Sequence, residues 1–123
     1  MQLINFKEST AENLILSVVQ PDLCVICDRS KIDTKGCLGS PDLVVEILSL
    51  RNSKNEMDLK FDLYQENKIL EYWIVHPFQK TILIYVIENE RYIGLKPYHE
   101  DSKIVSPTFP ELKVSVKKVF EIL

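Results

Sequence analysis

Short apolar runs rich in β-branched residues alternate along the chain with polar, turn-forming segments. Runs of roughly four to eight such residues are typical of β-strands. Residues 28–40 hold mainly turn-forming types and are expected to form a loop. The preceding run Leu14–Val19 suggests a short strand or arm. The pattern predicts strands at Asp22–Cys27, Asp42–Leu48, Glu71–Val75 and Thr81–Ile87, and a hairpin strand at Arg91–Tyr98 that pairs back through Asn89-Glu90.

Two helices are expected between and after these strands. The tetrapeptide Ser53-Lys54-Asn55-Glu56 matches the S-x-x-E capping box, so a helix should begin near Asn55. It should continue to about Glu66 and end around Asn67. The apolar-periodic stretch Val114–Leu123 is expected to be a short strand or turn followed by a closing helix.

Two charged residues interrupt the apolar pattern. Glu46 lies inside the predicted strand Asp42–Leu48, where a charge is costly unless it meets a metal, a partner charge or water. On the predicted helix, Lys60 lies near the middle of an apolar arc, so it should reach for a carboxylate or orient a water. Glu56 lies four residues before Lys60, at the spacing of a favourable ion pair. An internal ion pair and a catalytic lysine both remain open. The apolar arc comprises Met57, Leu59, Phe61, Leu63 and Tyr64.

A second carboxylate is expected beside Glu46. If the strands around the 28–40 loop form an antiparallel hairpin, Cys27 lies opposite about Asp42 and Asp22 opposite about Ile47. Asp22 then lies next to Glu46. Asp42 shares a face with Glu46, but four residues at ~3.3 Å each keep them roughly 13 Å apart. Carboxylates from adjacent strands suit Mg²⁺, which takes oxygen ligands and joins them to a phosphate.

Length, charge and cysteine content narrow the choice of function. The 123 residues should form a single domain, and 46% apolar content is ordinary for a globular protein. A net charge of −3 gives no bulk positive field, so binding of nucleic acid would rest on local arrangement and a metal. A signal peptide needs an unbroken apolar stretch, but Lys7, Glu8 and Glu12 interrupt the opening residues. No apolar run approaches the ~20 residues of a membrane span. We therefore expect a cytoplasmic location.

The three cysteines do not indicate a zinc or redox site. The CxxC pair Cys24 and Cys27 lies in a strand pattern, which points the two side chains to opposite faces. Neither histidine lies at the spacing of a zinc finger relative to these residues and Cys37. Buried free thiols are expected.

Several spaced motifs resemble one known family. The segments PDLCVIC, SPDLVVEILS and EYWIVHP, with the spacing of Glu56, Lys60 and Tyr64, are similar to the Uma-type restriction endonuclease family (domain of unknown function 820). That family is a branch of the PD-(D/E)XK nuclease superfamily. The resemblance covers about Val19 to the C terminus, and this chain is shorter than the family at its N-terminal end. It implies a restriction endonuclease-like α/β (α+β) fold, with a mixed β-sheet flanked by helices.

The resemblance also implies a divalent-metal-dependent endonuclease that hydrolyses DNA phosphodiester bonds. Asp22 and Glu46 would bind Mg²⁺ or Mn²⁺, Lys60 would orient the attacking water, and Glu56 would be auxiliary. The superfamily's lysine position holds Leu48, and the resemblance suggests that the lysine has moved to the helix, at Lys60. The family's aspartate before Pro77 is His76, expected to be a turn residue.

A second hypothesis is a catalytically silent relative that serves as a dimerisation or protein-binding module. Because the short N-terminal part should leave a sheet edge or face open, we expect a homodimer, in which Leu14–Val19 could be exchanged between protomers.

Overall fold

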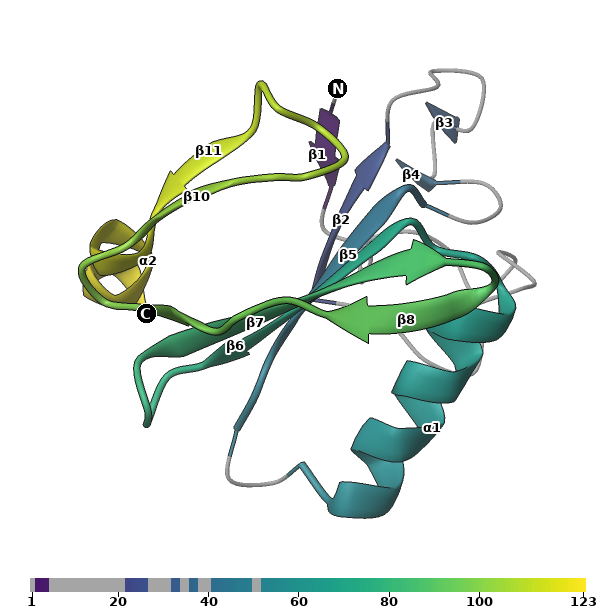
Figure 1. The fold of residues 1–123 in the computed structure, drawn as a ribbon, viewed down its shortest axis with the longest axis horizontal. Helices are drawn as coiled ribbons and strands as arrows, with labels where there is room; N and C mark the ends of the chain where they lie inside the picture. The colour runs from purple at the N-terminus through teal and green to yellow at the C-terminus, as the bar shows by residue number, and fades with distance from the viewer. Residues whose placement is uncertain (1, 5–21, 27–31, 34–35, 38–40, 50–51) are drawn as a thin grey trace.

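One mixed β-sheet forms the middle of the protein, with a helix on each side of it (Figure 1). The computed structural model describes residues 2–4, 22–26, 32–33, 36–37, 41–49 and 52–123. The strands of the main sheet are β1 (Gln2–Ile4), β2 (Leu23–Ile26), β5 (Leu43–Ile47), β6 (Glu71–His76), β7 (Thr81–Glu88), β8 (Arg91–Gly94) and β9 (Tyr98–His99). The predicted mixed sheet flanked by helices is confirmed.

The strand order is β1-β2-β5-β6-β7-β8, and β9 also pairs with β7. The neighbours β5 and β6 are parallel, whereas every other described pair in this sheet is antiparallel. Parallel neighbours need a crossover connection, and here α1 (Lys54–Glu66) supplies it. This β-α-β connection brings the helix onto the face of the strand that precedes it. Two smaller sheets pair β3 (Ile32–Asp33) with β4 (Gly36–Cys37) and β10 (Lys103–Val105) with β11 (Lys113–Ser115).

The ends of α1 follow from local sequence. The Ser53 hydroxyl accepts a hydrogen bond from the Glu56 backbone N–H at 3.0 Å, as an N-cap should. Asn67 is the C-cap, and its side-chain amide donates to the Leu63 carbonyl at 2.8 Å. The predicted start and end of this helix are therefore confirmed to within a residue.

The predicted hairpin turn after β7 is confirmed, but the predicted strand Arg91–Tyr98 is divided into β8, which ends at Gly94, and β9, which pairs with the start of β7. Asn89 and Glu90 both have positive φ, the conformation of the two-residue turn that matches strand twist. The closing helix α2 (Val116–Ile122) follows directly from β11, as the sequence predicted for Val114–Leu123.

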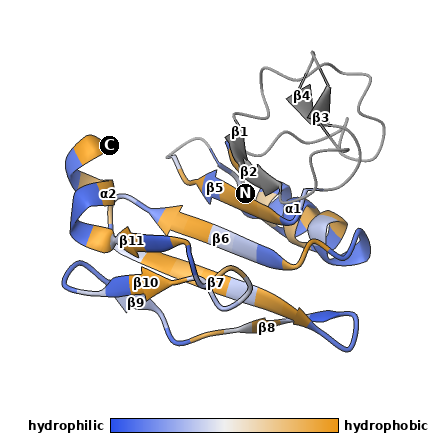
Figure 2. Ribbon diagram, turned by 90° about the horizontal axis from the view of Figure 1, so that it is seen from above, coloured by the Kyte–Doolittle hydropathy of each residue, from blue (hydrophilic) through white to orange (hydrophobic). Residues whose placement is uncertain are grey.

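Each face of the sheet has its own apolar core. On the α1 face, Tyr64 and Ile69 pack with Val44, Tyr72 and Ile74 of the strands. Figure 2 shows apolar colouring along the central strands and polar colouring at the turns that join them. Tyr72 and Trp73 are buried core residues, as predicted. The α2-side core consists of Leu43, Val45, Trp73, Val75, Ile82, Ile84, Ile104, Phe109 and Val116.

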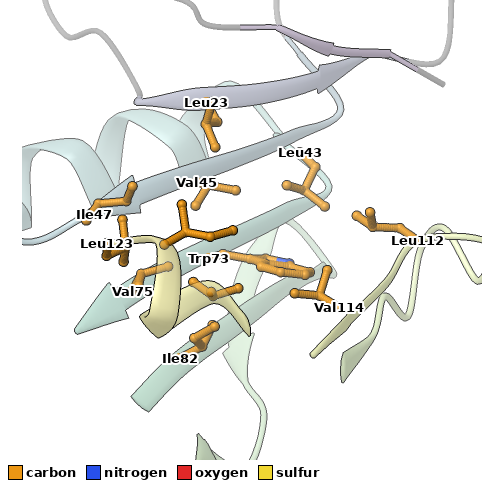
Figure 3. Close-up of a pocket in the computed structure, with 12 residues that line it drawn as sticks. Leu23, Leu43, Val45, Ile47, Trp73, Val75, Ile82, Leu112, Val114 and Leu123 are labelled. Atoms are coloured by element: carbon orange, nitrogen blue, oxygen red, sulfur yellow. The ribbon is translucent and has the colours of Figure 1, made fainter. Parts of the chain in front are cut away.

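The α2 face is not completely filled. A cavity of about 340 Å³ lies between the sheet, β11 and α2, and its lining side chains are all apolar (Figure 3). Trp73 and Val75 line it from the sheet, and Ile122 and Leu123 from the C-terminal end. The last two are 84% and 54% exposed. This face therefore presents apolar surface to the outside.

Some sequence predictions differ from the structure. The 28–40 segment was expected to be a loop, but it contains the small β3–β4 hairpin, and the β10 strand was not expected. His76 was expected in a turn but is the last residue of β6, where it pairs with Thr81. The short N-terminal part was expected to leave a sheet edge or a face open, but the outer edge of β2 pairs with β1. Leu59 was placed in the apolar arc but is 53% exposed, because α1 docks with Lys60 and Tyr64 at the centre of its buried face.

Three predictions lie outside the part of the chain that the structure describes. They concern the strand or arm at Leu14–Val19, the cysteine side chains and the end of the predicted strand at Cys27. None of the described helices is long and apolar enough to span a membrane.

Candidate active site at Glu46

Glu46 faces α1 from the middle of the sheet. Alternate residues of a strand point to opposite faces, so Val44 and Glu46 lie on the α1 side while Leu43, Val45 and Ile47 lie on the α2 side. The strand is buried between two neighbours, and Glu46 is only 3% exposed. The acid predicted inside an apolar strand is therefore buried there, and its carboxylate needs polar partners.

Both carboxylate oxygens of Glu46 bond to side chains of α1. The Lys60 Nζ lies 3.0 Å from Oε2, and the Tyr64 hydroxyl donates to Oε1 at 2.7 Å. Lys60 is 8% exposed and Tyr64 is fully buried. Because residues four apart share one face of a helix, a single docked helix supplies both partners. The expected reach of Lys60 toward a carboxylate is confirmed.

Glu56 stands one turn before Lys60 at the exposed edge of this site. Its Oε1 lies 3.8 Å from the Lys60 Nζ, and its side chain is 45% exposed. Lys60 thus contacts both glutamates, but the closer and more buried partner is Glu46. The predicted ion pair between Glu56 and Lys60 is present, although it is the weaker of the two contacts.

The pKa of Glu46 is raised from its ordinary value. Burial is the largest cause, because the charged carboxylate loses contact with water. The hydrogen bond from Tyr64 and the charge of Lys60 lower the pKa and so oppose burial, while the negative charge of Asp22 adds a smaller upward effect. An acid with a raised pKa beside a buried cation is a combination often found at catalytic sites.

Asp22 approaches Glu46 from the adjacent strand. The observed pairs Leu23 with Val45 and Cys24 with Val44 place Asp22 level with Glu46 itself. The predicted register, with Asp22 opposite about Ile47, was one residue off. The Asp22 Oδ2 accepts a hydrogen bond from the Ile47 backbone N–H at 2.7 Å. The predicted neighbourhood of Asp22 and Glu46 is thus present.

The donor set fits a hard divalent cation only in part. Two carboxylates on adjacent strands provide oxygen ligands of the kind that Mg²⁺ and Mn²⁺ prefer. Among the residues that the structure describes, however, no three His, Cys, Asp or Glu side chains cluster as a metal site would. A metal here would rely on the two carboxylates together with water and substrate oxygens, which Mg²⁺ commonly retains. The metal site remains a prediction.

Tyr64 was not predicted as a site residue. The signal was in the sequence, because Tyr64 follows Lys60 by one helical turn on the same face. Burial, together with the Glu46 charge and hydrogen bond, raises the pKa of the Tyr64 hydroxyl far above its ordinary value. The hydroxyl therefore stays protonated and acts as a hydrogen-bond donor to Glu46.

A second tyrosine hydroxyl lies in the same aromatic cluster. The Tyr72 ring packs edge-on against Tyr64 at 5.1 Å between centroids. Tyr72 is fully buried, and its hydroxyl has no hydrogen-bond partner among the described residues. Burial, followed by the Glu46 charge, raises the pKa of Tyr72. Two buried tyrosines thus stand near one carboxylate, and only Tyr64 bonds to it.

The sequence reasoning also missed a second buried acid, Glu71, on the opposite face. Its carboxylate accepts hydrogen bonds from the Trp73 Nε1, the Ser106 hydroxyl and the Thr108 backbone N–H. The Ser106 contacts are 3.0 and 2.8 Å long. No lysine or arginine appears among these partners. Because Ser106 and Thr108 follow β10, their hydrogen bonds to Glu71 attach the turn after β10 to the sheet.

Comparison with known proteins agrees with this description. The family model described as "Putative restriction endonuclease" (Uma2) matches residues 11–117. The fold is similar to the crystal structure of a putative nuclease belonging to DUF820 from Anabaena variabilis ATCC 29413, with a TM-score of 0.64 and 23% sequence identity. That match covers 84% of this chain and 60% of the nuclease chain. The comparison with curated proteins finds no match.

Proposed function

Because the chain belongs to the Uma2 family of restriction endonuclease-like proteins, we propose that it is a divalent-metal-dependent endonuclease that hydrolyses DNA phosphodiester bonds. The observation that carries the proposal is the buried Glu46, bonded to Lys60 and level with Asp22. A structural ion pair alone is a weak reason for so costly an arrangement, since burying two charges rarely adds net stability.

The roles follow from position and chemistry. Asp22 and Glu46 supply oxygen ligands from adjacent strands, and the Mg²⁺ or Mn²⁺ they would hold supplies Lewis-acid stabilisation of charge on a phosphate. The Lys60 ammonium lies 3.0 Å from Oε2 of Glu46, so it can orient a water or a phosphate oxygen beside the carboxylate. Glu56 has an auxiliary role, because its partly exposed carboxylate stays near the Lys60 ammonium.

Plasmid cleavage tests the proposal. Purified wild-type protein should nick or linearise supercoiled DNA with Mg²⁺ or Mn²⁺ and should lose this activity in EDTA. Asp22→Asn should lower the rate by about 100-fold or more, because it removes a ligand charge. Asp62→Asn is the matched control, since it removes a carboxylate from an exposed position of α1. Metal-independent cleavage, or equal activity of both variants, would overturn the proposal.

A second candidate is a catalytically silent member that serves as a protein-binding or dimerisation module. One observation favours it: both oxygens of Glu46 are already engaged by Tyr64 and Lys60. Isothermal titration with Mn²⁺ separates the two readings. Stoichiometric binding supports the endonuclease, whereas no heat at any concentration, together with no cleavage, supports the silent module.

We also propose that the protein acts in the cytoplasm as a homodimer. The apolar cavity on the α2 face, with Ile122 and Leu123 exposed beside it, supports association because apolar surface of this kind is usually covered. Light scattering behind a sizing column should give twice the monomer mass of 14.3 kDa. A single peak at the monomer mass, unchanged on concentration, would contradict the dimer.

A further inference from the structure

The two oxygens of Glu46 have partners of different kinds. Oε2 meets the ammonium of Lys60, a compact charge at the end of a flexible four-carbon stem. Oε1 meets the hydroxyl of Tyr64, a neutral donor on a ring. The two contacts therefore respond differently when a cation approaches the carboxylate.

A divalent ion at Glu46 would compete with Lys60 more than with Tyr64. The divalent ion and the ammonium would repel each other at one carboxylate. This repulsion favours movement of the ammonium away from Oε2, which the flexible stem of Lys60 allows. A neutral hydroxyl does not repel the ion, and each carboxylate oxygen can accept more than one contact. The Tyr64 hydrogen bond can thus persist while Lys60 is displaced toward solvent. The partly exposed carboxylate of Glu56, whose Oε1 already lies 3.8 Å from the Lys60 Nζ, lies on that side.

Packing holds the Tyr64 hydroxyl in place. The residue is fully buried in the α1-face core, and its ring meets Tyr72 edge-on at an interplanar angle of 75°. A fully buried ring in a close-packed core has little freedom to turn its hydroxyl away. Its bond to Oε1 therefore sets the orientation of the Glu46 carboxylate within the strand.

We propose that Tyr64 is a positioning residue of the metal site, which holds Oε1 of Glu46 and so fixes the orientation of the carboxylate that would bind the metal. The inference rests on the proposed metal-dependent function. It assigns to Tyr64 a role in metal affinity that an aromatic core residue would not have. Partners that orient a ligand in this way typically change metal affinity by about 10- to 100-fold when removed.

The chain offers a closely matched control. Tyr64→Phe removes a buried hydroxyl that bonds to Glu46, whereas Tyr72→Phe removes a buried hydroxyl in the same cluster that has no partner among the described residues. Both substitutions keep the ring and its packing. A difference between them therefore reports the bond to Glu46 and not the loss of a phenol from the core.

Calorimetric titration of the metal-free full-length protein with Mn²⁺ tests the proposal. We expect Tyr64→Phe to bind Mn²⁺ about 10- to 100-fold more weakly than wild type, and Tyr72→Phe to bind with unchanged affinity. Cleavage by Tyr64→Phe should recover at saturating Mn²⁺, which a general loss of structure would not allow. Melting curves of both variants confirm that the titrated protein is folded.

Each other outcome has a defined meaning. Wild-type affinity in Tyr64→Phe, or an equal loss in Tyr72→Phe, overturns the positioning role while leaving the proposed nuclease intact. Absence of Mn²⁺ binding by wild type overturns the proposed function and the role of Tyr64 together. A stabilising osmolyte serves as a control for loss of stability. It should leave the difference in Mn²⁺ affinity between Tyr64→Phe and Tyr72→Phe unchanged.

Discussion

Glu46 and Glu71 are both buried in central strands of one sheet, but they meet different partners on opposite faces. Glu71 is fully buried and is held by an indole N–H, a hydroxyl and a backbone N–H. Glu46 is 3% exposed and is held by a lysine and a tyrosine from one helix. Glu71 thus accepts hydrogen bonds from neutral donors in several parts of the fold. Glu46 is paired with the ammonium of a flexible lysine side chain.

The difference separates an acid that fixes structure from an acid that can exchange partners. The Trp73 indole N–H and the Thr108 backbone N–H cannot leave Glu71 without movement of the packed ring or of the backbone itself. Lys60 can leave Glu46 by rotation of its stem alone. Burial of a carboxylate is therefore not enough to identify a functional site, and the kind of partner is more informative.

Removal of Glu46 should produce the largest functional effect. Glu46→Ala deletes a proposed metal ligand, so calorimetric titration with Mg²⁺ or Mn²⁺ should detect no binding and plasmid cleavage should be lost. If wild type and Glu46→Ala give the same titration, the metal site lies elsewhere or is absent, and the contrast with Glu71 loses its functional meaning.

Removal of Lys60 should affect both rate and stability. Lys60→Met keeps most of the apolar stem but leaves the Glu46 charge buried without its cation, at a cost of about 3 kcal/mol in the free energy of unfolding. Loss of the cation beside the proposed metal site should also lower the cleavage rate by roughly 100- to 10,000-fold. Urea unfolding and single-turnover cleavage measure the two effects.

A double variant shows whether the loss of stability and the loss of cleavage in Lys60→Met have separate causes. Lys60→Met combined with Glu46→Gln removes both charges, so it should regain part of the lost stability but none of the activity. Equal stability of the single and double variants would show that the buried pair is not the source of the loss.

Removal of Glu71 should affect stability alone. Glu71→Ala leaves the buried Trp73 indole N–H without its acceptor, at about 1–3 kcal/mol, and the partly buried Thr108 backbone N–H adds a smaller cost. A loss of about 3 kcal/mol corresponds to a fall in Tm of roughly 10 °C for a domain of this size. Below its Tm the variant should still bind Mn²⁺ like wild type. Loss of Mn²⁺ binding in folded Glu71→Ala would break the proposed division between the two acids.

Local features of the site could be predicted from the sequence, whereas contacts across the fold could not. The capping box fixed the helix start, and the place of Lys60 in an apolar arc indicated a buried ammonium in need of a carboxylate. Whether that carboxylate was Glu46 or Glu56 depends on how α1 docks on β5, which residue spacing does not encode. The register of Asp22 was one residue off because the 28–40 connection contains a hairpin of its own.

Glu71 illustrates the limit more clearly. Its partners Ser106 and Thr108 lie 35 and 37 residues further along the chain. They meet the carboxylate only after the β10–β11 segment has folded over the sheet. The sequence around Glu71 reads as an ordinary strand, and nothing in its spacing marks the distant donors.

The smallest expected effect is a pH dependence of stability that Glu46 confers. Burial raises the pKa of Glu46 above its ordinary value of 4.5, so the folded protein keeps a proton that the unfolded chain has already released. Between 4.5 and the raised pKa the folded state therefore binds more protons, and the free energy of unfolding falls as pH rises. Above the raised pKa both states are ionised and the contribution becomes constant.

Urea unfolding from about pH 4 to about pH 8 measures this effect against Glu46→Gln, which cannot titrate. Wild type should lose stability relative to Glu46→Gln as pH rises through the window. In Tyr64→Phe the window should extend to higher pH, because the hydrogen bond from Tyr64 lowers the pKa of Glu46. A difference between wild type and Glu46→Gln that stays constant with pH would mean that burial does not raise this pKa. Glu46 would then resemble an ordinary ion-paired carboxylate, and the contrast with Glu71 would rest on partner type alone.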